Sequence, residues 1–75
     1  MFAMQLRPEV LKRLREQHPK GTRVELIEMN DPYREMPPGL KGTVQMVDDA
    51  GGIHINWDNS STLAAIYGID KIRAI

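Results

Sequence analysis

The chain has 75 residues, of which 41% are hydrophobic and 27% charged, and its formal net charge is zero. This length supports a single domain with a small core, and the composition is that of a folded globular protein rather than a disordered one. The lack of cysteine excludes disulfides, thiolate metal sites and a cysteine nucleophile. Small secreted domains usually depend on disulfides, so we expect a cytoplasmic protein.

The sequence gives no sign of membrane insertion. No apolar run approaches the ~20 residues that a membrane-spanning helix needs. The opening segment MFAMQLRP lacks the basic end and long apolar stretch of a signal peptide. We therefore expect no association with a membrane.

The first predicted element is a short helix from Pro8 to His18. Proline suits a first helical turn because its missing N–H would have no partner there, and the residue before a second proline tends to end a helix. Val10, Leu11 and Leu14 share one face. Three apolar residues cannot stabilise an isolated helix, so we expect this segment to dock on the remainder of the domain or on a second copy.

Five short strands are predicted after Lys20, at residues 23–29, 42–47, 53–57, 62–66 and 71–75. In the first strand, Val24 and Leu26 lie on one face and Ile27 and Met29 on the other, which indicates a bulge or a strongly coiled strand.

Alternation also predicts which side chains of the next two strands point inward. In the second strand these are Val44 and Met46. In the third, Trp57 has the same parity as Ile53 and Ile55, so we expect its indole ring in the core rather than on a ligand-binding surface.

The strand spacing is typical of a small barrel that closes to hide its edges. A long loop at residues 30–39, tight turns at 48–52 and 58–61, and a single turn at 67–70 match the order of an SH3-like barrel. We predict an α+β, mostly β fold, in which an N-terminal basic helix (residues 1–19) docks on a five-stranded SH3-like barrel (residues 20–75).

Residue types used in catalysis are present but poorly arranged. His54, Asp58, Ser60 and Ser61 crowd at one hairpin end, and a domain of this size has little room for a water-excluded active site. A metal at His54, Asn56 and Asp58 would lack enough convergent ligands. We predict a protein that is not an enzyme and that uses no metal or cofactor.

A tyrosine-proline patch is the first candidate binding surface. Its predicted protein-binding residues are Tyr33, Met36, Pro37 and Tyr67, with Pro38 beside them. The two tyrosines come together if the SH3-like order holds, and an exposed aromatic-proline surface is of the kind that binds proteins. The alternative is that both rings pack over the backbone of their loops.

Basic residues near the start of the chain are the second candidate surface. Residues 1–23 hold six basic and two acidic side chains, a balance of +4, whereas residues 24–75 hold four and eight, a balance of −4. The predicted nucleic-acid-binding residues are Arg7, Lys12, Arg13, Arg15 and Lys20, and Arg23 is a further cation of this group. They could neutralise several phosphates, although the barrel is acidic and has no row of aromatic residues for base stacking.

Four sequence motifs suggest a family relationship for residues 20–75. They are DPY, PPG-x-x-G-x-V, I-H-x-N-W-D-N and a final G-x-D-x-x-R. In these the chain resembles a family of small bacterial and phage proteins known only as a domain of unknown function, found largely in Gram-positive bacteria and their mobile elements. The resemblance implies a compact barrel and a mobile-element origin, and it carries no known site residues.

We therefore predict a non-catalytic interaction module that binds a protein partner. Given the mobile-element resemblance, a concrete version is an inhibitor of a host defence system such as CRISPR. The alternative is a small nucleic-acid-binding regulator that uses the basic helix. A third option is a homodimer, joined through the helix or through unpaired strand edges.

Overall fold

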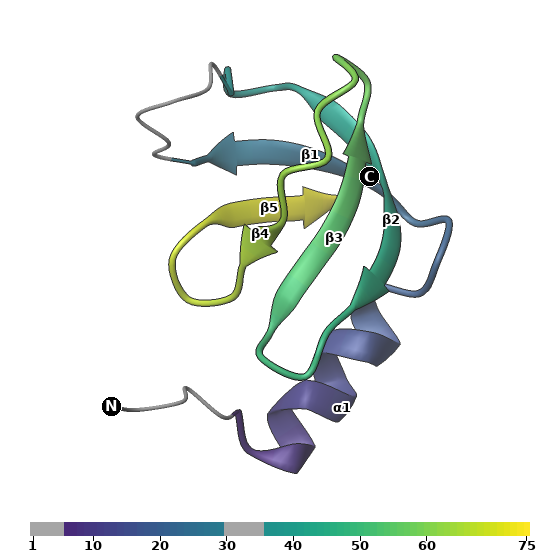
Figure 1. The fold of residues 1–75 in the computed structure, drawn as a ribbon, viewed down its shortest axis with the longest axis vertical. Helices are drawn as coiled ribbons and strands as arrows, with labels where there is room; N and C mark the ends of the chain where they lie inside the picture. Colours follow the sequence, from purple (N-terminus) through teal and green to yellow (C-terminus); the bar gives the residue numbers. More distant parts are fainter. Residues whose placement is uncertain (1–5, 30–35) are drawn as a thin grey trace.

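The computed structural model describes residues 6–29 and 36–75, which form one helix and a five-stranded antiparallel sheet (Figure 1). The elements are α1 (Pro8–Gln17), β1 (Arg23–Glu28), β2 (Lys41–Val47), β3 (Gly52–Trp57), β4 (Ala65–Ile66) and β5 (Lys71–Ala74). The α+β, mostly β class and the order of the elements are confirmed. The fourth strand is much shorter than predicted, with two residues instead of five.

The sheet is open. Its strand order is β4-β3-β2-β1-β5, so β4 and β5 are the two edges. The predicted closure into an SH3-like barrel is therefore wrong for the described residues. A physical reason is the shortness of β4: its two residues pair with Gly52 and Ile53 of β3, and the turn at residues 67–70 then leads directly into β5.

Two bulges change which side chains are buried. In β1 the pairing with β5 shifts between Leu26 and Glu28, which confirms the predicted bulge. In β2 the pairing with β3 shifts between Val44 and Met46. Val47 is consequently buried and Met46 is 53% exposed. The prediction that Met46 points inward is wrong because it assumed an uninterrupted alternation.

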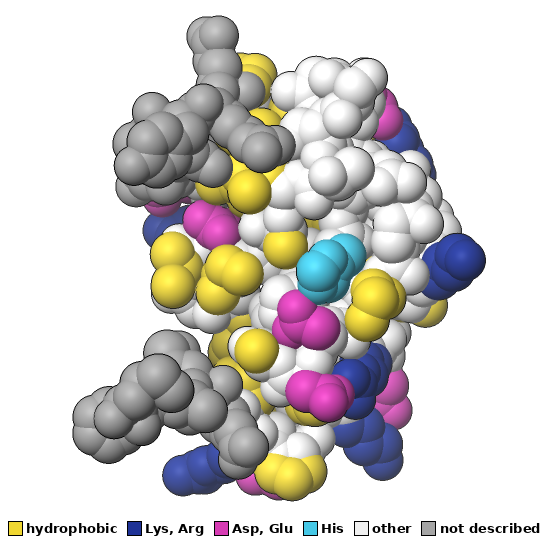
Figure 2. Space-filling model, in the orientation of Figure 1, with side chains coloured by type: hydrophobic (Ala, Val, Ile, Leu, Met, Phe, Trp, Pro, Cys, Tyr) yellow, Lys and Arg dark blue, Asp and Glu magenta, His cyan; other side chains and the backbone are white. Residues whose placement is uncertain are grey.

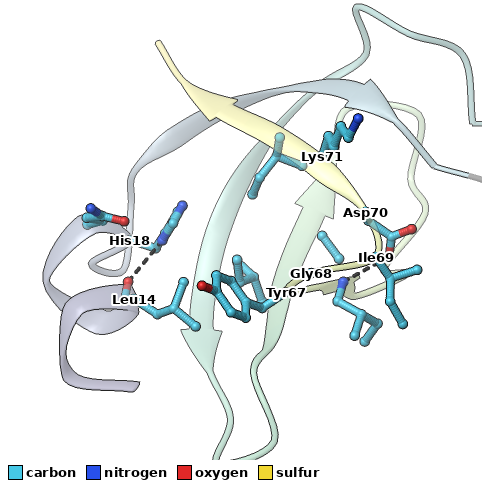
Figure 3. Close-up of a pocket in the computed structure, with 12 residues that line it drawn as sticks. Leu14, His18, Tyr67, Gly68, Ile69, Asp70 and Lys71 are labelled. Carbon is cyan, nitrogen blue, oxygen red and sulfur yellow. Dashed lines mark hydrogen bonds between the residues drawn. The ribbon is translucent and has the colours of Figure 1, made fainter. Parts of the chain in front are cut away.

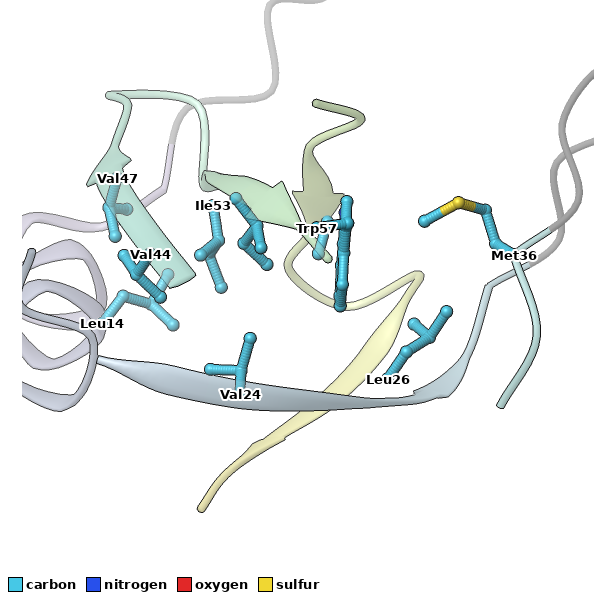
Figure 4. Packing of buried hydrophobic residues seen from close by; sticks show 10 residues of the cluster. Leu14, Val24, Leu26, Met36, Val44, Val47, Ile53 and Trp57 are labelled. Atoms are coloured by element: carbon cyan, nitrogen blue, oxygen red, sulfur yellow. The ribbon is translucent and has the colours of Figure 1, made fainter. Parts of the chain in front are cut away.

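The core is one cluster of ten buried side chains drawn from the helix, four strands and the loop before β2 (Figure 4). They are Leu14, Val24, Leu26, Met36, Val44, Val47, Ile53, Ile55, Trp57 and Ala65. Leu14 joins α1 to the sheet. The predicted core position of Trp57 is confirmed: it is 3% exposed, and its indole N–H donates to the Leu63 carbonyl oxygen at 2.8 Å. Its polar atom is thus satisfied within the core.

α1 is the one helix of the described segments, and it is too short and too polar to cross a bilayer.

Candidate functional site

A groove lies in the gap between the two edges of the open sheet (Figure 3). Residues of both edge strands line it, and the C-terminal half of α1 forms its other wall. Its volume is about 360 Å³. The lining side chains are mainly apolar, with Leu14, Ile53, Ala65, Ile66, Tyr67, Ile69 and Ile72 among them. The groove therefore exists because the sheet does not close.

Tyr67 connects this groove to a second hollow of about 240 Å³. Leu14, Gln17 and Tyr67 line both hollows, and Val10 and Arg13 of α1 complete the second one. In Figure 3 the Tyr67 ring extends from the β4–β5 turn toward Leu14. Since it is 46% exposed, a ligand in either hollow would contact this ring.

The apolar side chains around the groove are open to solvent. Ile66, Tyr67 and Ile69 are 37%, 46% and 68% exposed. Figure 2 shows hydrophobic side chains gathered over the β4–β5 turn, at the left of that view. By contrast, Ile53 and Ala65 are almost fully buried and form part of the groove floor. An apolar side chain from a partner would gain contact with both sets.

The β4–β5 turn is held by hydrogen bonds within itself. The Ile66 N–H donates to the Asp70 carboxylate at 2.8 Å, and the Ile66 carbonyl accepts from the N–H groups of Ile69 and Asp70 at 3.1 and 2.9 Å. Gly68 supplies the positive φ of +85° that this turn requires. The turn is therefore a fixed wall of the groove.

Cationic and titratable groups border the groove on the helix side and at β5. Arg13 lines the smaller hollow, and Lys71 lines the larger one, with its ammonium 3.6 Å from Glu28. The imidazole Nδ1–H of His18 donates to the Leu14 carbonyl at 2.9 Å and so covers the end of α1. Asp70 is the acidic residue of the lining, and its carboxylate is already engaged in the turn.

The structure describes only some residues of the predicted tyrosine-proline patch. Tyr33 lies outside the described residues. Met36 is 7% exposed and belongs to the core, at the far end of the cluster from Leu14 (Figure 4). Pro37 is exposed, and Tyr67 is in the groove facing Leu14. The structure thus places Tyr67 with the helix rather than with Met36, and the binding role of these residues stays a prediction.

The predicted phosphate-binding cations divide into those that are bonded within the protein and those that are not. Arg15 is bonded: its guanidinium donates to the Val47 carbonyl at 3.3 Å and to Asp49 at 2.7 Å, which fastens α1 to the β2–β3 hairpin. The other four are exposed, and no carboxylate of residues 6–29 or 36–75 lies within ion-pair distance of them: Arg7, Lys12, Arg13 and Lys20. Their role in nucleic-acid binding stays a prediction.

Arg23, the remaining basic residue near the start of the chain, is also bonded within the protein. It donates two hydrogen bonds to Asp58, at 2.9 and 2.7 Å, and a third to the Thr43 hydroxyl at 3.0 Å. The bidentate pair lowers the pKa of Asp58 and raises that of Arg23. This pair links β1 to the end of β3.

Histidine and aspartate also meet at the β2–β3 turn. The Nε2–H of His54 donates to Oδ2 of Asp48 at 2.8 Å, since the carboxylate can only accept. Oδ1 of Asp48 accepts from the N–H groups of Gly52 and Ala50 at 2.7 and 3.0 Å. These hydrogen bonds, that of His54 first, hold the pKa of Asp48 below its ordinary value. The arrangement fixes a turn.

The residue types considered for catalysis do not assemble into a triad. His54 is bonded to Asp48 and not to Asp58, which pairs with Arg23. The Ser61 hydroxyl accepts from the N–H of Leu63 at 3.3 Å. Among the residues that the structure describes, no three His, Asp or Glu side chains converge on one point as metal ligands would. The absence of enzymatic activity and of a cofactor stays a prediction.

Sequence reasoning did not find most of the groove. It placed Leu14 in the helix face and Tyr67 in a patch, but it missed His18, Ile69 and Ile72 as neighbours of one cavity. One local signal was available. Ile69 is an isoleucine in the middle of a tight turn between Gly68 and Asp70, where a polar residue is the usual choice.

Comparison with known proteins gives a family but no function. No significant match was found among curated proteins or among solved structures. The model of one family, described as a domain of unknown function (DUF4314), matches residues 7–75, and this range includes all six elements of the fold. The chain therefore belongs to the DUF4314 family.

Proposed function

We propose that this protein is a non-catalytic interaction module that binds a protein partner through the groove between the two sheet edges and α1. The observation that carries the proposal is the distribution of exposed apolar side chains. Of the six large hydrophobic residues exposed in the described segments, three border this groove: Ile66, Tyr67 and Ile69. Apolar groups gathered around a cavity mark interaction sites, whereas scattered ones do not.

The form of the groove favours a protein segment over a small metabolite. Small-molecule sites combine an enclosing apolar cavity with a few convergent polar groups. Here Asp70 and His18 are occupied by hydrogen bonds within the protein, and Ile69 lies largely in solvent. An open apolar groove of this kind suits an anchoring side chain from a larger partner.

Charge indicates the composition of the partner segment. Arg13 and Lys71 border the groove, and Lys12 adds an exposed cation on α1. An apolar anchor with acidic neighbours would therefore match the apolar lining and the cationic rim together. Inhibition of a host defence system and a mobile-element origin stay predictions, because neither the fold nor the family bears on them.

A peptide selection tests the proposal. Random peptides are selected for binding to the immobilised protein, and their affinities are compared between wild type, Ile69→Asp and the control Met46→Asp. Met46 is exposed to a similar degree but lies outside the groove. We expect selected peptides with an apolar residue among acidic ones, which lose about tenfold or more in affinity for Ile69→Asp only.

Two results would contradict this function. Selected peptides that bind Ile69→Asp as tightly as wild type would show that the groove is not the site. A random single-stranded DNA of about 20 nucleotides whose affinity falls steeply with salt, and which no longer binds after Lys12→Glu and Arg13→Glu, would support the nucleic-acid regulator instead. The exposed cations of α1 are the observation that keeps this alternative in the test.

A further inference from the structure

The outer edge of β5 has free main-chain groups. The N–H of Ile75 donates to the Arg23 carbonyl at 3.0 Å, so in the antiparallel ladder with β1 the hydrogen-bonded residues of β5 are those in register with Arg23 and Glu25. The intervening residues of β5, Ile72 and Ala74, therefore direct their N–H and C=O groups away from β1. Residues 6–29 and 36–75 contribute no hydrogen bond to these outward groups.

The outer edge of β4 is different. The N–H of Tyr67 donates to the Gly51 carbonyl at 3.0 Å, so Ala65 faces β3 and Ile66 faces outward. Both outward groups of Ile66 are already bonded within the turn, the N–H to Asp70 and the carbonyl to Ile69 and Asp70. Of the two sheet edges, β4 is closed by its own turn and β5 is open.

The open edge and the groove are next to each other. Lys71 and Ile72, the first two residues of β5, line the groove. Ile72 is half-buried and packs against the core cluster. An extended chain beside β5 would therefore place every second side chain on the same face as Ile72, next to the groove.

We propose that the partner segment binds as an additional β-strand on the free edge of β5, with its apolar side chains directed to the groove. This inference rests on the proposed function and specifies how the partner is held. The N–H and C=O groups of Ile72 and Ala74 would pair with the main chain of the segment, as in other complexes where a peptide extends a sheet.

The two faces of β5 predict an alternating partner sequence. Ile72 and Ala74 share one face, whereas Lys71 and Arg73 share the other, where their side chains are 70% and 62% exposed. These cations already lie near Glu28 and Glu25 of β1, and a strand on the opposite side would present further carboxylates to them. A segment that alternates apolar and acidic residues matches both faces.

The same charges argue against a second copy of the chain as the occupant. Continuation from β5 of one copy to β4 of another is blocked, because the outward groups of β4 are occupied. Antiparallel pairing of β5 with β5 would bring together Lys71 and Arg73 of both copies, and like charges on neighbouring strands are destabilising. An acidic strand from another protein has neither disadvantage.

The first test uses a synthetic probe, the end-blocked peptide Glu-Val-Glu-Leu-Glu-Val-Glu. Two analogues carry N-methyl groups, one on the apolar residues and the other on the inner glutamates. In a strand the N–H groups of these two sets point to opposite edges. We expect the unmodified peptide to bind, one analogue to lose about tenfold or more in affinity, and the other to bind as the parent does.

The second test changes the protein and not the peptide. Ala74→Pro removes an N–H that points away from β1, at an edge position where proline is tolerated, so the ladder with β1 remains. We expect Ala74→Pro to lose about tenfold in affinity for the peptide. Ala74→Thr, which keeps the N–H and changes only the side chain, should lose much less affinity than Ala74→Pro does. The methylated peptides decide the matter even if the proline variant unfolds.

Three outcomes would overturn strand addition. In the first outcome, Ile69→Asp loses affinity for the peptide, Ala74→Pro binds it as tightly as wild type does, and both methylated analogues bind as tightly as the unmodified peptide. The groove would then bind side chains only, and the proposed function would stand without strand addition. If the wild type does not bind the peptide at about 1 mM, and selected peptides ignore Ile69→Asp, both proposals fail. If the protein alone forms dimers that Ala74→Pro dissociates, the occupant is a second copy.

Discussion

A Cβ atom added at Gly42, in β2, would lie 2.5 Å from the Ile55 side chain and 2.9 Å from the Trp57 ring, whereas one added at Gly68, in the β4–β5 turn, would meet nothing within 4 Å. The two positions represent two regions of the molecule. The β2–β3 region is closely packed around Trp57, and the region between α1, β4 and β5 is open. In so small a domain the first region provides the stability that allows the second to leave apolar groups in solvent.

Removal of the tryptophan side chain should have the largest effect. Trp57→Ala leaves a large cavity in the buried cluster and removes the hydrogen bond to the Leu63 carbonyl. We expect a loss of about 3–5 kcal/mol in the free energy of unfolding, measured by urea denaturation with circular dichroism. Met46→Ala, at an exposed position of β2, is the control and should have little effect. Equal midpoints for the two variants would contradict the assignment of the stable region.

Overpacking of the β2–β3 region should cause the second-largest loss of stability. In Gly42→Ala the new methyl group would overlap the Ile55 and Trp57 side chains and approach the Asn56 carbonyl at 3.0 Å. We expect a loss of about 1–3 kcal/mol from strain, measured by the same denaturation.

A second glycine separates crowding from backbone strain. Gly21 has a φ of +93° and open space around it, so Gly21→Ala should lose only the smaller conformational contribution, about 1 kcal/mol. If Gly21→Ala were the more damaging of the two changes, the close packing around Gly42 would not be what limits stability.

The β2–β3 turn should make the stability depend on pH. The folded-state pKa of Asp48 lies below its ordinary value of about 3.9. Its contribution is therefore fully present above pH 5 and is lost as the pH falls through the folded pKa. Asp48→Asn should lose about 1 kcal/mol at pH 7, since the side chain is partly exposed.

The comparison across pH is the decisive measurement. The difference in unfolding free energy between wild type and Asp48→Asn should shrink as the pH is lowered from 5 to about 2, because protonation removes the same charge from the wild type. Asp49→Asn is the control, since the Asp49 side chain is 93% exposed and its ion pair with Arg15 lies in solvent. A difference that stays constant with pH would show that the Asp48 charge does not stabilise the turn.

Local patterns predicted most of the buried core well. The apolar face of α1, the alternation of Ile53, Ile55 and Trp57, and the change of face after Leu26 all correspond to the structure. These features depend on residues near in sequence. Met46 was predicted wrongly because a bulge depends on the pairing of β2 with β3, which the alternation within one strand does not contain.

The open region was predicted poorly because distant contacts create it. The turn formers at residues 67–70 indicated a turn, but the alternation did not show that residues 62–64 would stay outside the fourth strand. The carbonyls of Ser61 and Leu63 instead accept from the main-chain and indole N–H groups of Trp57, and β4 has only two residues. The sheet therefore ends in a short edge strand and stays open. The groove then forms where α1 meets the two sheet edges, so Leu14 and Ile72 line one cavity although they lie far apart in the chain.

Substitution of a groove residue, Tyr67, should have the smallest effect on stability. Tyr67 is 46% exposed, and the residues that the structure describes make no hydrogen bond to its hydroxyl group. Tyr67→Ala should therefore lose no more than about 1 kcal/mol in urea denaturation, yet it removes the ring that lines both hollows. Tyr67→Phe, which keeps the ring, should retain peptide affinity, whereas Tyr67→Ala should weaken it about tenfold. A large loss of stability for Tyr67→Ala with unchanged affinity would mean that the ring supports the fold and that the two regions are not separate in function.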